Sequence, residues 1–260
     1  MTSLPVQDVI STVTAKEFVR KINGMDRLKR ENAALDAILD GEFPAYMKEF
    51  VDIVLVFADS TGTGRKLTIK VLPDYLMIGT HDDHLRMPLM PITAQKIADE
   101  WNCILPTPHM TTLIWSAAQK LPPQPWGPPY DASMMSTDRF VKHNERIELS
   151  ILKGKLDSTK LIGGHKKDVV ITKQLTNQYY KKRVAIFGWH QADGKPIQPL
   201  YLGHEILYSD YSHGIRLVSK ECLLDDQPDD LTRVLEDPTV CMSVSSEGPL
   251  SQVRYTYQRT

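Results

Sequence analysis

Two short apolar runs constrain the fold of this chain more than any other feature. Asp168–Thr172 and Arg183–Trp189 are rich in β-branched residues and are flanked by polar residues, which is the pattern of buried strands. The polar connection Gln174–Lys182 between them is suited to closing a hairpin. An antiparallel pairing centred on this connection places His165 opposite His190. Because Cβ atoms of opposed residues lie about 4.5–5.5 Å apart, we expect these two histidines to meet at one end of the hairpin.

The chain around this hairpin continues with more strand-like and turn-like pieces. Pro199–Tyr208 is predicted to add a neighbouring strand that carries His204. Ser209–Gly214 is rich in Asp, Ser and Gly, which favour tight turns. Ile215–Val218 then resumes an apolar strand, so that His213 is expected at a junction between turn and strand. Loops held by a rigid sheet are common places for functional residues.

The segment from Gly163 to Gly214 holds four of the eight histidines. Asp168 and Asp210 each lie three residues from a histidine, and an Asp on an imidazole fixes its tautomer and stabilises its cation. We therefore expect a polar functional site here. The candidate catalytic residues are His165, Asp168, His190, His213 and, as a weaker nucleophile candidate, Cys103; the candidate substrate contacts are Arg216, His204, Trp189 and Tyr211.

The rest of the chain predicts an α+β fold with a mainly antiparallel sheet and N-terminal helices. The apolar spacing indicates helices over 15–39 with a break at Asn23-Gly24, and over 92–101, 108–121, 136–151 and 229–236. Thr14 and Glu17 are expected to form a capping box at the start of the first helix. Strands are expected over 50–57 and 66–72, joined as a hairpin by the glycine-containing loop 58–65, and over 74–79 and 252–257. Residues 122–131 are rich in proline and form a linker or a stiff loop. This segment divides residues 1–121, an N-terminal α+β region, from 132–260, a histidine-rich β region, unless both belong to one continuous domain.

Composition excludes several classes of protein. Apolar residues make up 42% of the chain and charged residues 24%, which is enough for a sizeable core. The net charge is −1 and no basic block occurs, so we expect no nucleic-acid partner. No apolar run is long enough for a transmembrane helix, and the N-terminus lacks a signal-peptide pattern. The chain is then cytoplasmic, or exported with its leader removed, and the sequence leaves its oligomeric state open.

The three cysteines, Cys103, Cys222 and Cys241, form no C-x-x-C pair. A disulfide between the last two remains open. Cys103 comes shortly before an expected helix start, with Thr107 as N-cap and Pro108 at the first helical position. It is either a nucleophile, if its sulfur lies near the helix terminus, or a small buried core residue.

Some short strings resemble known families. A cysteine before a helix, followed by histidines on later adjacent strands, resembles papain-like cell-wall amidopeptidases and implies Cys103 as nucleophile, His165 as base and His190 as its orienting partner. Gly203-His204 followed by Ser212-His213-Gly214-Ile215-Arg216-Leu217 resembles the active-site segment of L,D-transpeptidases, although the family's cysteine is missing after Gly214. The strings LPTPHM, GHKKDVV and DYSHGIRLV are similar to those of a group of bacterial proteins of unknown activity.

These patterns lead to one leading function and two alternatives. The leading prediction is a hydrolase that cleaves amide bonds of a peptide-like or cell-wall polymer without a cofactor. A zinc hydrolase would use the same histidines, since a catalytic zinc needs three protein ligands. A non-catalytic module would bind a glycan or peptide on a platform of Trp126, Trp189 and Tyr211. The string His81-Asp-Asp-His84 offers further metal ligands, but a solvated turn is the favoured interpretation.

Overall fold

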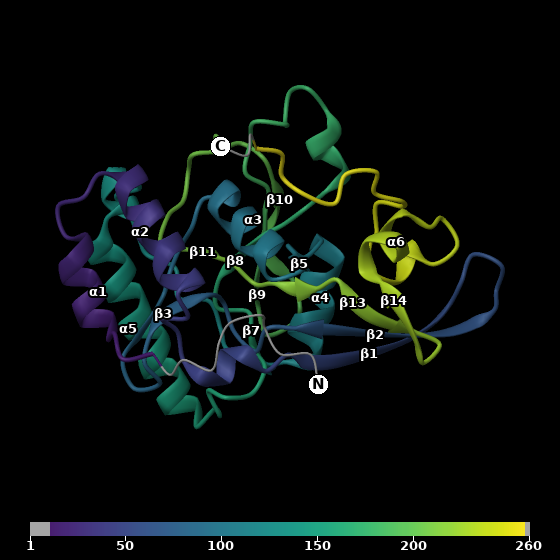
Figure 1. Cartoon of the computed structure of the whole chain (residues 1–260), viewed down its shortest axis with the longest axis horizontal. Helices are drawn as coiled ribbons and strands as arrows, with labels where there is room; N and C mark the ends of the chain where they lie inside the picture. Colours follow the sequence, from purple (N-terminus) through teal and green to yellow (C-terminus); the bar gives the residue numbers. More distant parts are fainter. Residues whose placement is uncertain (1–10, 258–260) are drawn as a thin grey trace.

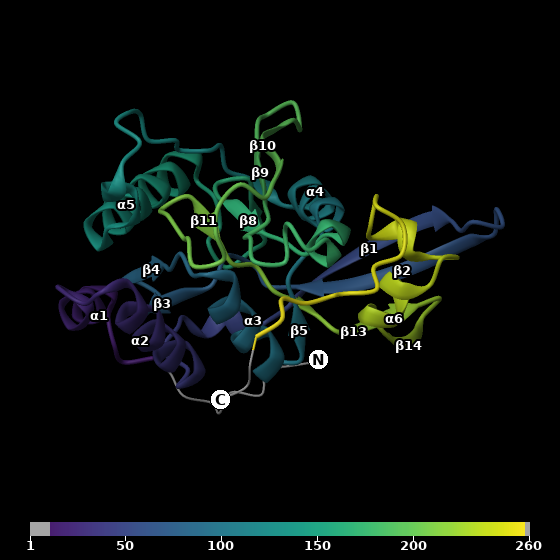
Figure 2. The same ribbon diagram turned by 90° about the horizontal axis from the view of Figure 1, so that it is seen from above.

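The computed structural model describes residues 11–257 and has the expected α+β fold (Figure 1). In both views, α1, α2 and α5 lie at one end of the molecule and the tip of the β1–β2 hairpin lies at the other (Figures 1 and 2). The helices of the described residues are α1 (Ala15–Ile22), α2 (Arg27–Leu39), α3 (Pro91–Glu100), α4 (Pro108–Ala117), α5 (Thr137–Gly154) and α6 (Leu231–Glu236), with short 3₁₀ turns at Ala45–Lys48, Ala132–Met135, Lys173–Thr176 and Cys241–Ser243.

The helix boundaries follow local signals in the sequence. Thr14 and Glu17 form the predicted capping box at the start of α1, each side chain accepting a backbone N–H of the other residue. Thr107 caps α4 by accepting the N–H of Met110. Gly24 has φ +77°, which ends α1 before α2 begins, as expected. These ends are set by contacts within a few residues, which is why the sequence could predict them.

A six-stranded sheet forms one part of the fold. Its strands run in the order β14, β13, β2, β12, β5, with β1 on the free side of β2. The expected hairpin of β1 and β2 is confirmed. Strands from before and after the proline-rich segment pair directly here, because β12 lies between β2 and β5. The strands are β1 (Val51–Ala58), β2 (Gly64–Val71), β5 (Cys103–Ile104), β12 (Val218–Ser219), β13 (Glu221–Leu224) and β14 (Gln227–Asp230).

A second sheet, of four strands, carries the histidine-rich segment in the order β10, β9, β8, β11. Asp168 pairs with Phe187 in the antiparallel β8–β9 ladder, which is the register that the sequence predicts. His213 is aligned with Lys167 because β11 runs parallel to β8. The strands are β8 (Lys167–Val169), β9 (Ile186–His190), β10 (Pro196–Tyr201) and β11 (His213–Gly214); two pairs complete the set, β3 (Met77–Gly79) with β4 (His84–Arg86), and β6 (Gln119–Lys120) with β7 (Ile162–Gly163).

Several predicted elements differ in the structure. The strand expected over 215–218 begins only at Val218, and the helix expected to reach residue 121 ends at Ala117. Residues 252–257 form no strand; side-chain hydrogen bonds hold this stretch instead, with Tyr255 N donating to Gln95 Oε1 and Tyr255 Oη donating to Val170 O, both at 2.9 Å. The strand expected over 199–208 begins earlier and ends at Tyr201, so that His204 follows β10. No helix among residues 11–257 is long and apolar enough to cross a lipid bilayer.

Candidate functional site

His165 lies in the protein interior, where it contacts a carboxylate from a distant part of the chain. Its Nε2 is 3.1 Å from Asp74 Oδ1, and Arg86 Nε donates to Asp74 Oδ2 at 2.9 Å. Burial disfavours the ionised carboxylate, but Arg86 and His165 outweigh it and hold the pKa of Asp74 well below its ordinary value. Burial also lowers the pKa of His165 to about 4, against the field of Asp74. These three fully buried side chains therefore form a charge-compensated unit in the core.

Asp168 and Arg216 lie beside this unit, and both contact Tyr75. Tyr75 Oη donates to Asp168 Oδ2 at 2.9 Å, while the Arg216 guanidinium lies 4.4 Å from the centre of the Tyr75 ring. Arg216 donates to the carbonyls of Leu72 and Ile162 at 2.7 and 2.6 Å. Burial raises the pKa of Asp168 to about 7, although Arg216 and the Tyr75 hydroxyl oppose the rise. Arg216 is fully buried and hydrogen-bonded to main-chain carbonyls. The structure therefore does not place it where it could contact a substrate, as the sequence predicted.

The predicted meeting of His165 and His190 is wrong, although the strand register is correct. The His190 ring stacks on Trp115 with centroids 5.4 Å apart, whereas the His165 ring faces Asp74. Gly188 and Trp189 have φ values of 119° and 58°. Left-handed residues interrupt the alternation of side chains along a strand, so the residue that follows them does not keep the face that the register alone assigns.

Lys166 is buried next to these groups, although it comes from a polar stretch of the sequence. Its Nζ donates to Tyr211 O at 2.8 Å and lies 3.4 Å from His143 Nδ1. Burial lowers the pKa of Lys166 to about 7, with Arg86 adding to the effect. The neighbouring Lys167 is half-buried and lies over the ring of Trp189. Adjacent strand residues point to opposite faces, which separates the two lysines.

A second group of polar side chains is partly open to solvent. We call it the His213 cluster, and it consists of Lys167, His204, Tyr208, Asp210 and His213. The rings of His204 and Tyr208 stack with centroids 4.0 Å apart, and Tyr208 lies edge-on to His213 at 5.6 Å. Tyr208 Oη donates to Asp210 Oδ2 at 2.8 Å. The structure therefore brings two of the predicted histidines and one predicted acid together here.

Charge in the His213 cluster is arranged around one buried imidazole. His213 is fully buried, and neither of its ring nitrogens has a hydrogen-bond partner among the described residues. Burial lowers the pKa of His213 to about 4, and Asp210 opposes this while Lys167 adds to it. Burial also disfavours ionised Asp210, but His213 and the hydrogen bonds from Ser212 outweigh it and lower the pKa of Asp210. A buried imidazole normally finds a partner, so the two nitrogens of His213 are suited to a bound group or water.

Cys103 lies in the first sheet and contacts none of these side chains. It is fully buried, and its Sγ donates to the carbonyl of Trp101 at 3.2 Å. Burial raises the pKa of the Cys103 thiol to about 12, which is opposite to what a thiolate nucleophile needs. The described environment is that of a small core residue. Cys222 and Cys241 are both free, so the disulfide left open by the sequence is not formed.

The three aromatic residues proposed as a binding platform do lie together, but mostly in the interior. Tyr211 has Trp126 and Trp189 as neighbours, at centroid distances of 6.4 and 6.3 Å. Trp189 and Tyr211 are 5% and 2% exposed, so little ring surface is open to a ligand. The guanidiniums of Arg139 and Arg146 lie 4.1 and 3.6 Å from the Trp126 ring. These aromatic rings are therefore packed against one another and against arginine side chains of the protein.

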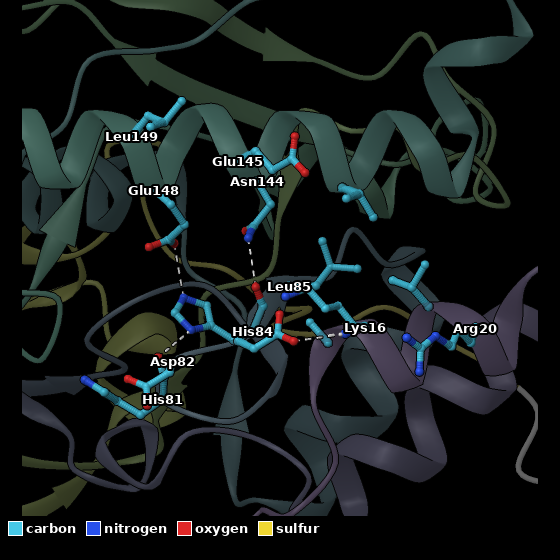
Figure 3. A pocket seen from close by; sticks show the side chains of 14 residues that line it. Lys16, Arg20, His81, Asp82, His84, Leu85, Asn144, Glu145, Glu148 and Leu149 are labelled. Carbon is cyan, nitrogen blue, oxygen red and sulfur yellow. Dashed lines mark hydrogen bonds and ion pairs between the residues drawn. The ribbon is translucent and has the colours of Figure 1, made fainter.

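A pocket of about 760 Å³ opens between α1 and α5 (Figure 3). His84 forms part of its floor; its Nδ1 lies 3.1 Å from His81 O and its Nε2 lies 3.1 Å from Glu148 Oε1. Both partners are hydrogen-bond acceptors. Arg86 also donates to Glu148, which connects the pocket floor to the buried Asp74. His84 is buried, so the predicted solvated turn is limited to the exposed His81 and Asp82 and the half-buried Asp83.

Neither the comparisons with known proteins nor the grouping of possible metal ligands assigns a function to this chain. The chain matches no protein-family model, and neither the curated proteins nor the solved structures give a significant match. The resemblances seen in the sequence therefore rest on the short strings alone. Among residues 11–257, no three His, Cys, Asp or Glu side chains are grouped to hold one metal ion, so the zinc alternative has no ligand set in the part that the structure describes.

Several central residues were missed in the sequence. Asp74 lies in the bend between β2 and β3, Arg86 on β4 and Glu148 on α5, and no local motif links them. Lys166 was hidden in a polar string, although strand alternation would have placed it on the same face as Asp168. The alternation of side chains along a strand was the one signal in the sequence that could have identified Lys166 as buried.

Proposed function

We propose that the chain is a hydrolase that cleaves an amide bond of a peptide-like polymer at the His213 cluster. The observation that carries this proposal is the state of His213, which is buried with two unpartnered ring nitrogens beside an acid and a lysine. The neutral form of its imidazole dominates at pH 7 because burial lowers its pKa to about 4. A neutral imidazole can take a proton from water, as a general base does. The substrate class comes from the sequence resemblances.

The residues of the cluster suit the steps of such a reaction. His213 would remove a proton from water as the water oxygen bonds to the amide carbon, and would return that proton to the leaving nitrogen as the C–N bond breaks. Lys167 is aligned with His213 on the neighbouring strand and would stabilise the negative oxygen. Asp210 would stabilise the imidazolium that forms in between. His204 and Tyr208 form the partly open side of the cluster, where substrate would approach.

The test is release of free amines from muropeptides and short peptides, followed by mass spectrometry. We expect His213→Asn to lower kcat by about 10²–10⁴-fold, the usual contribution of a general base. His109→Asn is the control, because His109 lies on α4 and in neither polar cluster. Because His213 is fully buried, its replacement should lower Tm, so both variants are assayed well below their measured melting temperatures. A chelator should leave activity unchanged, whereas a zinc hydrolase would lose it. Full activity of His213→Asn, or no amine release from any of these substrates, would overturn the proposal.

A further inference from the structure

The α1–α5 pocket has an apolar floor between two helices. Side chains of Val19, Leu85, Val141 and Leu149 line it, and Leu149 is 54% exposed. Its volume of about 760 Å³ lies within the roughly 300–1,000 Å³ of small-ligand sites. The pocket is therefore large enough for a molecule with several apolar groups, and it lies outside the His213 cluster.

The two helical walls of the pocket carry opposite charge. Lys16 and Arg20 are one turn apart on α1, and Glu145 and Glu148 are one turn apart on α5, so each pair shares a helix face. Figure 3 shows the α1 pair on one side of Leu85 and the Glu148–His84 pair on the other. Asp82 and Asp83 also line the pocket, and Asp83 Oδ2 accepts the backbone N–H of Lys16 at 3.4 Å. The side chains of Lys16 and Arg20 offer a ligand positive charge on the α1 wall, and Glu145 and Glu148 offer negative charge on the α5 wall.

Some of these charged side chains are already paired within the protein, and others are not. Glu148 already pairs with His84 and Arg86, and they outweigh burial to lower its pKa to about 2. Among the described residues, the side chains of Arg20 and Glu145 make no hydrogen bond or ion pair, and both are exposed at the pocket. The Lys16 side chain likewise makes no hydrogen bond or ion pair with the described residues, whereas Arg20 acts electrostatically on Glu17 of the same helix. The α1 cations and the Glu145 carboxylate are thus open to a ligand across an apolar floor.

The chemistry of the lining narrows the ligand further. A guanidinium can bind a carboxylate through two parallel hydrogen bonds. A quaternary ammonium is usually bound by a cage of aromatic rings, but no Trp, Tyr or Phe is among the described lining residues. A carboxylate wall instead suits a primary ammonium, which donates hydrogen bonds.

We propose that the α1–α5 pocket binds a short apolar peptide with free ends. Its carboxylate would bind Arg20, its ammonium would bind Glu145, and its aliphatic side chains would lie on Val19, Leu85 and Val141. This site is separate from the proposed hydrolase centre, and its occupancy does not depend on that activity. A bound peptide would bury apolar surface on both partners, which favours association.

Isothermal titration calorimetry of the full chain with trileucine tests the proposal. Two end-blocked forms, N-acetyl-trileucine and trileucine amide, each remove one terminal charge. A charge-assisted hydrogen bond contributes about 1.5 kcal/mol or more, so each block should weaken binding about tenfold. Absence of binding by free trileucine, or equal affinity for all three peptides, would overturn the proposal.

Substitutions of exposed pocket residues test where the two ends of the peptide bind. Arg20→Gln should weaken free trileucine about tenfold and leave little difference between it and the amide, because the carboxylate loses its partner. Glu145→Gln should do the same for the acetylated form. Lys21→Gln on α1 and Asp138→Asn on α5 lie outside the pocket lining and should keep wild-type affinity. If both pocket variants bind like these controls, the peptide does not use this site.

Discussion

Replacement of Asp168 by Asn should change how stability depends on pH. Asp168 is 2% exposed, and burial raises its pKa from the ordinary 3.8 to about 7. Between these two pH values the folded chain holds a proton that the unfolded chain has lost. The free energy of unfolding therefore falls as pH rises through this window and levels off above pH 7.

The size of the effect follows from the shift. A difference of about 3 units, at 1.36 kcal/mol per unit, makes the Asp168 contribution fall by about 4 kcal/mol between pH 4 and pH 7. Asn keeps the shape of the side chain and stays neutral at every pH, so it lacks this component. The unfolding free energy of the wild type minus that of Asp168→Asn should thus decrease by about 1.4 kcal/mol per pH unit.

Equilibrium unfolding in urea from pH 4.5 to 8 measures this difference, because the other titrating groups are common to both proteins. Asp210→Asn provides a contrast, because its difference in unfolding free energy from the wild type should stay flat over this pH range. The pKa of Asp210 is lowered, so its contribution is present above the ordinary pKa and is lost as pH falls below it. Parallel stability curves for the wild type and Asp168→Asn between pH 4.5 and 7 would refute the reasoning, since they would mean that Asp168 is ionised throughout.

Three further predictions follow from packing. Gly214→Ala should destabilise the chain by about 1–3 kcal/mol and lower Tm, because the added Cβ would lie 2.5 Å from Tyr75 Cδ1; Gly64→Ala, with open space at this position, should melt like the wild type. Cys103 should be unreactive toward a thiol reagent in the native protein and react once urea has unfolded it; fast native labelling, absent from Cys103→Ala, would contradict its burial. Arg216→Lys should cost about 1–3 kcal/mol in urea unfolding, since an ammonium lacks the planar fork that spans two buried carbonyls; an unchanged midpoint would show that those carbonyls do not need it.

The sequence by itself determined the fold class, several helix ends and the pairing of β1 with β2 and of β8 with β9. The capping box at Thr14, the N-cap at Thr107 and the break at Gly24 were all predicted because such signals act within a few residues. The β8–β9 register was also predicted, since the apolar runs and the connection between them leave few alternatives.

The tertiary structure alone decided which side chains meet. Left-handed backbone at Trp189 separated His190 from His165, and the partner of His165 came from Asp74, 91 residues away. A buried charge pairs with an opposite charge that tertiary packing places next to it, because an unpaired charge in the core is costly. That choice depends on the whole fold, and no local pattern in the sequence records it.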